Sequence, residues 1–279
     1  MHWHKIGYYA GCAATLAVCV LSAWKLIDYY GDVRSSKHQL DEAKTLYREA
    51  NQTTQTKALP PFVPIPNTMP VDLKSKSPFA ASDRANLPAS LTVQERFKTL
   101  LQTNSDVVGW LKIDGTTIDY PVLQAEDNAF YLKKDLYRND NVTGSIFMDY
   151  RNHIDRPEYH WIVYGHYMND EIMFKGLLKY KDEDYYEEHT VISFDTLYGD
   201  LKWLIFSVYY TDVNEDYIRT EFADDEQFWS FAGDLKANSL YDTGISVGAD
   251  DTILTLSTCS RTEEGGRFTV HAKLITATS

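Results

Sequence analysis

The sequence predicts a mainly β fold, a barrel or sandwich decorated by helices, beginning near Ser90. Short apolar or alternating runs recur along the chain from Val107 and are separated by turn residues. Tyrosine, which suits half-buried strands, is frequent, with 20 copies in 279 residues. Segments with helical spacing are few and short between these runs. We therefore expect one large β-rich body over residues 90–279.

The N-terminal segment predicts a membrane anchor. An almost uncharged run from Ile6 to Trp24 lies between two lysines. Its length is close to the ~20 residues that a helix needs to cross a bilayer. A cleaved signal peptide is the alternative, but no persuasive small-x-small cleavage site follows, and Trp24 with the tyrosines after it suits an interfacial belt. We expect residues 1–5 in the cytoplasm, 6–27 as a single pass through the cell membrane, and the body outside the cell.

Residues 28–89 are expected to join the anchor to the body. The pattern from Tyr29 to about Asn51 predicts a helix rising from the membrane. Seven of the nine prolines then fall between Pro60 and Pro88. Proline breaks helices and cannot donate to a strand ladder, so this stretch predicts an extended spacer that holds the body away from the membrane.

Within the body, the patterns predict the elements in order. Strands are expected at 107–113, 117–122, 144–149, 161–166, 191–195, 201–210, 252–256 and 267–276. Helices are expected from 91 to 101 and at 173–180, 182–188 and 221–238, with a short helix or turn at 128–133. Asp114-Gly115 is typical of a hairpin turn between the first two strands.

Composition excludes several functions. The net charge of −13 argues against nucleic acid as a partner, because phosphates reward clustered Lys and Arg. There is no phosphate-binding or dinucleotide-binding glycine pattern, and no His or Cys pair stands at zinc-ligand spacing. The sequence therefore predicts neither a cofactor nor a metal.

Cys259 is the only cysteine of the predicted body, since Cys12 and Cys19 lie in the anchor. The body therefore cannot form an internal disulfide, and a free thiol stands at the end of an apolar strand. A strand end is a rigid mount for a nucleophile, and the thiolate is the reactive form. A lone cysteine is more often a small buried hydrophobe, so its neighbours decide.

Two residues supply what a cysteine nucleophile needs. His166 ends an apolar strand and follows Gly165, which permits an unusual turn. Arg267 opens the last strand and offers a fixed cation with a planar donor fork. Cys259, His166 and Arg267 together suit acyl transfer through a thioester. The remaining body histidines are discounted, three because they lie among charged loop residues and the last because it lies mid-strand: His153, His160, His189 and His271.

These motifs resemble those of the sortases, membrane-anchored cysteine transpeptidases of Gram-positive bacteria. The resemblance rests on T-L-S-T-C at 255–259, Y-G-H at 164–166 and the arginine that leads R-F-T-V-H-A-K-L-I at 267–275. Class B is the most similar class, because of the helical insert before the cysteine strand and of four further segments: D-V-V-G-W-L-K-I at 106–113, I-D-Y-P-V-L-Q at 118–124, D-N-A-F-Y-L at 127–132 and G-S-I-F-M-D-Y-R-N at 144–152.

The resemblance implies an eight-stranded sortase-type β-barrel with N-terminal helices. It implies that Cys259 attacks a threonine carbonyl in an LPXTG-like or NPXTN-like sorting signal near the C-terminus of a secreted protein. His166 would protonate the departing amine and deprotonate the incoming one, and Arg267 would stabilise the oxyanion or position the signal. The acyl group would pass to a peptidoglycan cross-bridge amine, which anchors the protein at the surface. Implied signal-binding residues are Asn128, Leu132, Tyr164, Tyr217, Ile218 and Ser257.

Three alternatives stay open. A class B pilin polymerase would use the lysine amine of a pilin in place of the cross-bridge. A cell-wall cysteine peptidase would only hydrolyse, although papain-like families place the cysteine before the histidine, and here His166 precedes Cys259. A non-enzymatic β-domain on a wall-spanning stalk would not need the thiol.

Overall fold

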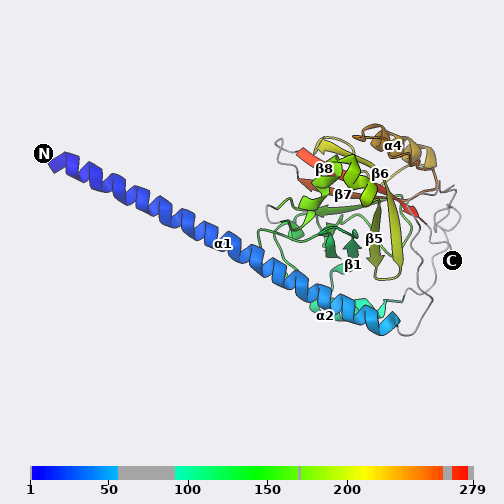
Figure 1. Cartoon of the computed structure of the whole chain (residues 1–279), viewed down its shortest axis with the longest axis horizontal. Coiled ribbons are helices and arrows are strands. Elements are labelled where there is room, and N and C mark those ends of the chain that lie inside the picture. The colour runs from blue at the N-terminus through cyan, green and yellow to red at the C-terminus, as the bar shows by residue number, and fades with distance from the viewer. Residues whose placement is uncertain (1, 56–91, 169–170, 260–265, 276–279) are drawn as a thin grey trace.

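Eight strands close into a barrel in the order β1-β2-β3-β4-β7-β8-β6-β5 (Figure 1). The computed structural model describes residues 2–55, 92–168, 171–259 and 266–275. The strands are β1 (Val107–Lys112), β2 (Asp119–Leu123), β3 (Phe147–Met148), β4 (His160–Gly165), β5 (Val191–Thr196), β6 (Asp200–Asp212), β7 (Ile253–Cys259) and β8 (Gly266–Ile275). The closed ring confirms the eight-stranded barrel that the resemblance implies.

Helices surround this barrel on its outer side. They are α1 (His2–Gln55), α2 (Glu95–Thr103), the 3-10 helices η1 (Phe130–Leu132) and η2 (Phe174–Lys181), α3 (Glu183–Glu188) and α4 (Asp225–Ala237). In Figure 1, α1 runs past one side of the barrel and extends far beyond it toward the N-terminus, while α4 lies on the barrel beside β6.

The predicted strands all have counterparts whose ends shift by a few residues. The strand expected at 144–149 shortens to β3, because a turn follows in which the Asn152 amide donates to the Asp149 carbonyl at 3.0 Å. The segment expected as a helix at 173–180 is a 3-10 helix. The predicted hairpin turn is confirmed, since Gly115 has a φ of 75°, in the left-handed region that favours glycine.

Two strand pairs are parallel, β2 with β3 and β4 with β7. The β4–β7 register runs from His160 opposite Ile253 to Gly165 opposite Thr258. On its other side β7 pairs antiparallel with β8. Because β4 and β7 run in the same direction, both end at the same edge of the barrel, where β8 begins.

Side chains along β7 point alternately into two hydrophobic cores. Leu254 and Leu256 are fully buried in the cluster that also holds Val270 of β8. Ile253 points the other way, into a cluster that it shares with Phe231 of α4. Period-two alternation thus gives β7 one core-facing side and one side that α4 covers. Fully burying each such side chain stabilises the fold by roughly 1.5–3 kcal/mol.

The helical insert α4 is built to cover that outer face. It begins where the Asp224 carboxylate accepts a hydrogen bond from the Gln227 amide at 2.8 Å, a favourable N-cap. Phe228, Phe231 and Leu235 recur at helical spacing and are buried against β6 and β7. The predicted insert before the cysteine strand is therefore confirmed.

Contacts with the barrel fix the C-terminal half of α1. The Tyr47 ring stacks on Trp110 with 4.3 Å between centroids, and its hydroxyl donates to Asp195 at 2.5 Å. About three turns nearer the N-terminus, the hydroxyls of Ser36 and Thr143 lie 2.6 Å apart. The predicted anchor and the predicted membrane-proximal helix are one continuous helix, and its second half is part of the body.

The expected extended form of the proline-rich segment lies outside the described residues. The packing of α1 nevertheless affects the spacer role that was predicted for this segment. The helices on either side of residues 56–91 contact each other: the rings of Tyr47 and Phe97 are 5.5 Å apart, and Arg96 donates to the Asn51 side chain at 3.1 Å. Since α1 itself meets the barrel, the distance between the barrel and the apolar N-terminal run is set by α1.

Replacing Tyr47 with alanine should lower the free energy of unfolding by about 3 kcal/mol, because a buried ring and its stack on Trp110 are lost. Denaturant titration of the full-length protein in detergent micelles, followed by tryptophan fluorescence, measures the change. Thr45→Ala, on the exposed side of the same helix, should change it by less than about 0.5 kcal/mol. Equal effects of both substitutions would contradict the docking of α1.

Candidate active site

Cys259, His166 and Arg267 meet at the edge where β4 and β7 end. Cys259 is the last residue of β7 and is the register partner of Arg267. On the other side of β7, Gly165 pairs with Thr258, so the next residue, His166, lies at the level of Cys259. Three neighbouring strands therefore place the predicted nucleophile between the predicted acid/base and the predicted cation.

Gly165 serves close packing and not an unusual turn, which corrects the sequence-based expectation. Its φ lies outside the left-handed region. A Cβ at this position would collide with the side chain of Ile146 and would lie 2.7 Å from the ring of Phe174. The missing side chain lets η2 pack directly against the end of β4, just before His166.

A backbone carbonyl holds the histidine ring. Nε2 of His166 lies 2.7 Å from the carbonyl oxygen of Leu132, at the end of η1. A carbonyl can only accept, so Nε2 carries a proton and the lone pair of the neutral ring is on Nδ1. The imidazolium makes the same hydrogen bond. Leu132 therefore supports both protonation states through which a general acid/base passes.

Arg267 is half-buried at the start of β8. Its Nη1 donates to the carbonyl of Gly266 at 3.0 Å. A guanidinium stays charged over the whole working pH range and presents several donors in one plane. The strand thus supplies a fixed cation at the position that pairs with Cys259.

Asp149 connects two of the predicted signal-binding residues. Its carboxylate is fully buried, and its Oδ2 accepts hydrogen bonds from the Asn128 side-chain amide and the Tyr164 hydroxyl, both at 2.9 Å. The Asn128 Oδ1 accepts from the Tyr150 amide at 3.0 Å, so both ends of the Asn128 amide are held. Burial and the charge of Asp149 raise the pKa of Tyr164 above its ordinary value, which keeps the phenol a donor.

Arg151 extends this network to a third segment. Its Nε and Nη2 donate to the two carboxylate oxygens of Asp149, both at 2.8 Å, in a bidentate pair. Nη2 also donates to the carbonyl of Ile218 at 3.1 Å. Burial alone would raise the pKa of Asp149, but hydrogen bonds from Arg151, Asn128 and Tyr164 hold it below its ordinary value. Sequence reasoning missed this pair, although two opposite charges directly after an apolar run were a signal.

Tyr217 and Ser257, two more predicted signal-binding residues, contact each other. Their hydroxyl oxygens are 3.0 Å apart, and both residues are buried. Ser257 stands two residues before Cys259 on β7, and Tyr217 belongs to the segment between β6 and α4. This hydrogen bond ties that segment to the strand that carries the cysteine.

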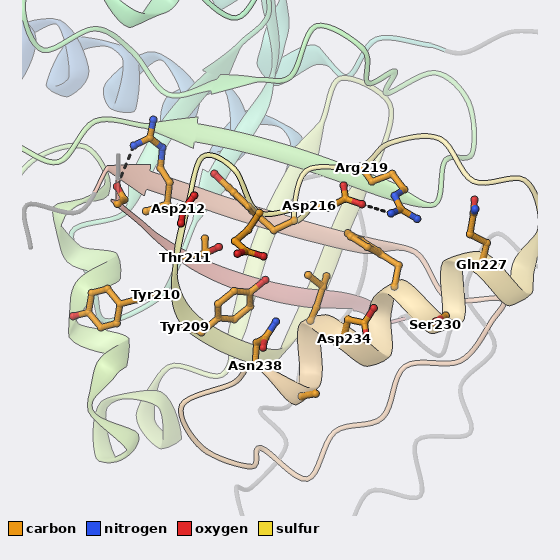
Figure 2. A pocket seen from close by; sticks show the side chains of 17 residues that line it. Tyr209, Tyr210, Thr211, Asp212, Asp216, Arg219, Gln227, Ser230, Asp234 and Asn238 are labelled. Atoms are coloured by element: carbon orange, nitrogen blue, oxygen red, sulfur yellow. Dashed lines mark hydrogen bonds and ion pairs between the residues drawn. The ribbon is translucent and has the colours of Figure 1, made fainter. Parts of the chain in front are cut away.

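A cavity of about 1250 Å³ adjoins the site between the end of β6, the following segment, α4 and the start of β8 (Figure 2). Tyr217 and Arg267 line it, whereas the predicted signal-binding residues on the β4 side do not. Figure 2 shows Asp216 and Arg219 as an ion pair on its wall. Among the described residues, those of this cavity included, no group of three or more His, Cys, Asp or Glu could hold a metal ion.

Two buried histidines form a second polar network on the outer face of β7. His271 is buried mid-strand, as expected, but the expectation that His160 lies in a charged loop was wrong, because β4 begins one residue before the apolar run. His160 lies 2.7 Å from the Arg219 carbonyl through Nδ1 and 2.7 Å from Thr255 Oγ1 through Nε2. Thr255 Oγ1 lies 2.7 Å from Nδ1 of His271. When both rings are neutral, Nδ1–H of His160 donates to the Arg219 carbonyl and its Nε2 accepts from the Thr255 hydroxyl. The Thr255 oxygen then accepts from Nδ1–H of His271.

Comparison with known proteins agrees with this geometry. The chain matches the family model of the sortase domain over residues 111–275. It is 32% identical to sortase B of Listeria monocytogenes serovar 1/2a over 278 residues, which covers 98% of this chain and 99% of the relative. It is 40% identical to sortase B of Staphylococcus aureus over 185 residues, which covers 66% of this chain and 76% of that protein.

Solved structures show the same likeness. The Staphylococcus aureus sortase B–substrate complex superposes with a TM-score of 0.71 at 29% identity, covering 88% of this chain and 99% of that one. Sortase B from Bacillus anthracis in complex with AAEK1 gives 0.69 at 33% identity, covering 89% and 100%. The chain therefore belongs to the sortase family, whose members are cysteine transpeptidases. Within that family it is of the sortase B type.

The free energy of unfolding should fall as the pH is lowered from about 6.5 toward 4. Burial lowers the pKa of His160 to about 4, whereas an unfolded histidine titrates near ~6.5, so the unfolded chain takes up the proton first. This histidine alone should cost about 3 kcal/mol by pH 4. Denaturant titrations across this pH range measure the slope. His160→Gln should be less stable at neutral pH yet depend less on pH, and an unchanged slope would refute this origin.

Proposed function

We propose that this sortase cleaves a C-terminal sorting signal of a secreted protein after its threonine and joins the threonine carbonyl to a cell-wall cross-bridge amine. The observation that carries the proposal is the strand register, which sets Cys259 between His166 and Arg267. A substrate complex of the similar Staphylococcus aureus sortase B adds support. The product would be a surface protein anchored to peptidoglycan.

In the first half-reaction, the Cys259 thiolate attacks the threonine carbonyl carbon while His166 holds a proton as imidazolium. Negative charge develops on the carbonyl oxygen, where the Arg267 guanidinium stabilises it. The C–N bond breaks as His166 gives its proton to the departing amine, which leaves a thioester on Cys259. The hydrogen bond from His166 Nε2 to the Leu132 carbonyl orients the ring throughout.

In the second half-reaction, the incoming amine loses a proton to His166 and attacks the thioester. The C–S bond breaks, the Cys259 thiolate leaves, and the new amide is released. The enzyme returns to its starting protonation state, so no cofactor is needed to balance the reaction. Water competes for the same thioester, and its exclusion from the site would favour the amine.

We assign the signal to a groove between two walls, one on each side of β7, the strand that ends at Cys259. The β4 side carries Asn128, Leu132 and Tyr164, and the segment after β6 carries Tyr217 and Ile218, with Ser257 on β7 between them. The support is that hydrogen bonds join each wall to its neighbours. LPXTG-like and NPXTN-like signals share the threonine that the mechanism requires.

The proposal includes α1 as a single membrane anchor with the barrel outside the cell. Within the described part of the chain, α1 is the one helix long and apolar enough to cross a membrane. Its apolar side chains Leu16, Leu21 and Ile27 are 67%, 57% and 71% exposed, which is favourable in lipid and costly in water. The docked second half of α1 would then hold the barrel close to the outer surface of the membrane.

Cys259→Ala should abolish both cleavage and transfer, because no thioester can form. Arg267→Lys should lower kcat by about 10²- to 10³-fold, because lysine keeps the charge but lacks the planar donor fork. The assay uses the full-length protein in micelles, fluorogenic NPXTN-type and LPXTG-type peptides, and mass spectrometry of the products. Arg156→Lys, at an exposed arginine on the surface, should leave transfer unchanged.

The products separate the alternatives. Preference for a cross-bridge-type peptide amine over water supports surface anchoring. Preference for a lysine side chain would indicate a pilin polymerase, and hydrolysis alone would indicate a peptidase. Full transfer by both Cys259→Ala and Arg267→Lys would overturn the proposed chemistry.

A further inference from the structure

The bidentate pair of Asp149 and Arg151 contacts both walls of the assigned groove. Asp149 is 0% exposed and directly follows β3. Its Oδ2 accepts from Asn128, Tyr164 and Arg151, and its Oδ1 accepts from Arg151 through Nε and through the backbone amide. One buried carboxylate thus collects hydrogen bonds from separate segments of the chain.

The bonds that the pair makes to other residues end on walls that the proposed function uses. Asn128 lies four residues before Leu132, whose carbonyl holds the ring of His166. Tyr164 lies two residues before His166 on β4. Arg151 reaches the opposite wall through the carbonyl of Ile218 at 3.1 Å. The pair therefore links the Asn128 side to the Ile218 side by hydrogen bonds.

Stability alone does not account for such a pair. Burying a carboxylate is costly, and apolar residues of similar volume often stabilise a fold as well or better. The pair adds a defined geometry, because a bidentate contact fixes both the distance between the guanidinium and the carboxylate and the relative orientation of their planes. Here the fixed groups are Asn128, Tyr164 and the Ile218 carbonyl.

We propose that Asp149 and Arg151 are positioning residues that set the spacing of the two walls of the signal groove and thereby its selectivity among sorting signals. The inference rests on the proposed function. It assigns no contact with the reacting atoms. Weakening the pair should therefore change signal recognition and leave the chemistry at Cys259 largely intact.

The chain supplies a control in a second ion pair that contains a buried aspartate. Asp251 Oδ2 lies 3.1 Å from Lys273 Nζ, and their side chains are 7% and 8% exposed. Lys273 pairs with Ile253, at the opposite end of β7 from Cys259. Asp251→Asn removes a buried charge of the same kind as Asp149→Asn without touching the groove.

The test measures kcat and KM of the full-length protein in micelles with NPXTN-type and LPXTG-type fluorogenic peptides. Asp149→Asn should raise KM for the preferred peptide by about tenfold while kcat changes by less than about threefold. Arg151→Lys keeps the charge but loses the fork, so its KM should rise by a smaller factor. Both should bring the kcat/KM ratio of the two peptides closer to one, and Asp251→Asn should change neither quantity.

Alkylation of Cys259 by iodoacetamide gives a readout that needs no signal peptide. The alkylation rate should stay within about twofold of the wild-type rate in all three variants, since the strand ends that carry Cys259, His166 and Arg267 are retained. If Asp149→Asn fails to fold, Arg151→Lys decides alone. Unchanged KM and peptide preference in the folded variants, or an equal rise of KM in Asp251→Asn, would overturn the inference. A wild-type protein that is alkylated but cleaves neither peptide would instead refute the proposed function, and the inference with it.

Discussion

The parallel register of β4 and β7 is the constraint on which the rest of this protein depends. Parallel neighbouring strands end at the same edge of a sheet, so the end of β4 lies beside Cys259. Because β8 is antiparallel to β7, its first residues, including Arg267, lie at the same level. A parallel pair also requires a long crossover. That crossover contains β5, β6 and α4, and α4 covers the outer face of β7. The shared strand edge at Cys259 and the cover that α4 gives to β7 therefore both follow from one strand pairing.

The contacts between α1 and the barrel fix the orientation of the barrel relative to the helix. A flexible tether would let the barrel take any orientation, whereas contacts from Ser36 to Tyr47 fix the barrel on the helix. Stacked aromatic rings add roughly 0.5–1.5 kcal/mol beyond the burial of their surface. With its apolar first half in a bilayer, α1 would present the groove at a constant height and angle. Sorting signals delivered at the membrane would then meet an oriented site.

Sequence patterns predicted the strands well because period-two alternation is a local property, and they singled out Cys259 because it is the only cysteine of the body. Buried polar partners were harder to predict. Asp149 acquires its meaning only from groups far away in the sequence, one of which is the backbone carbonyl of Ile218, which leaves no trace in residue identity. The same holds for the carbonyl of Leu132 that fixes His166. Gly165 was noticed, but its reason is the space that Phe174 occupies and not its φ.

The buried histidine network explains how the decisive register is enforced. Apolar alternation along β7 already opposes a one-residue slip, and His160, Thr255 and His271 add a chain of hydrogen bonds across β4, β7 and β8 in which every donor has one acceptor. A one-residue slip would turn Thr255 into the apolar interior and leave two imidazoles unsatisfied. Each unsatisfied buried group costs roughly 1–3 kcal/mol. These polar residues lie four or more positions from Cys259, His166 and Arg267, yet they hold together the three strands whose ends carry those residues.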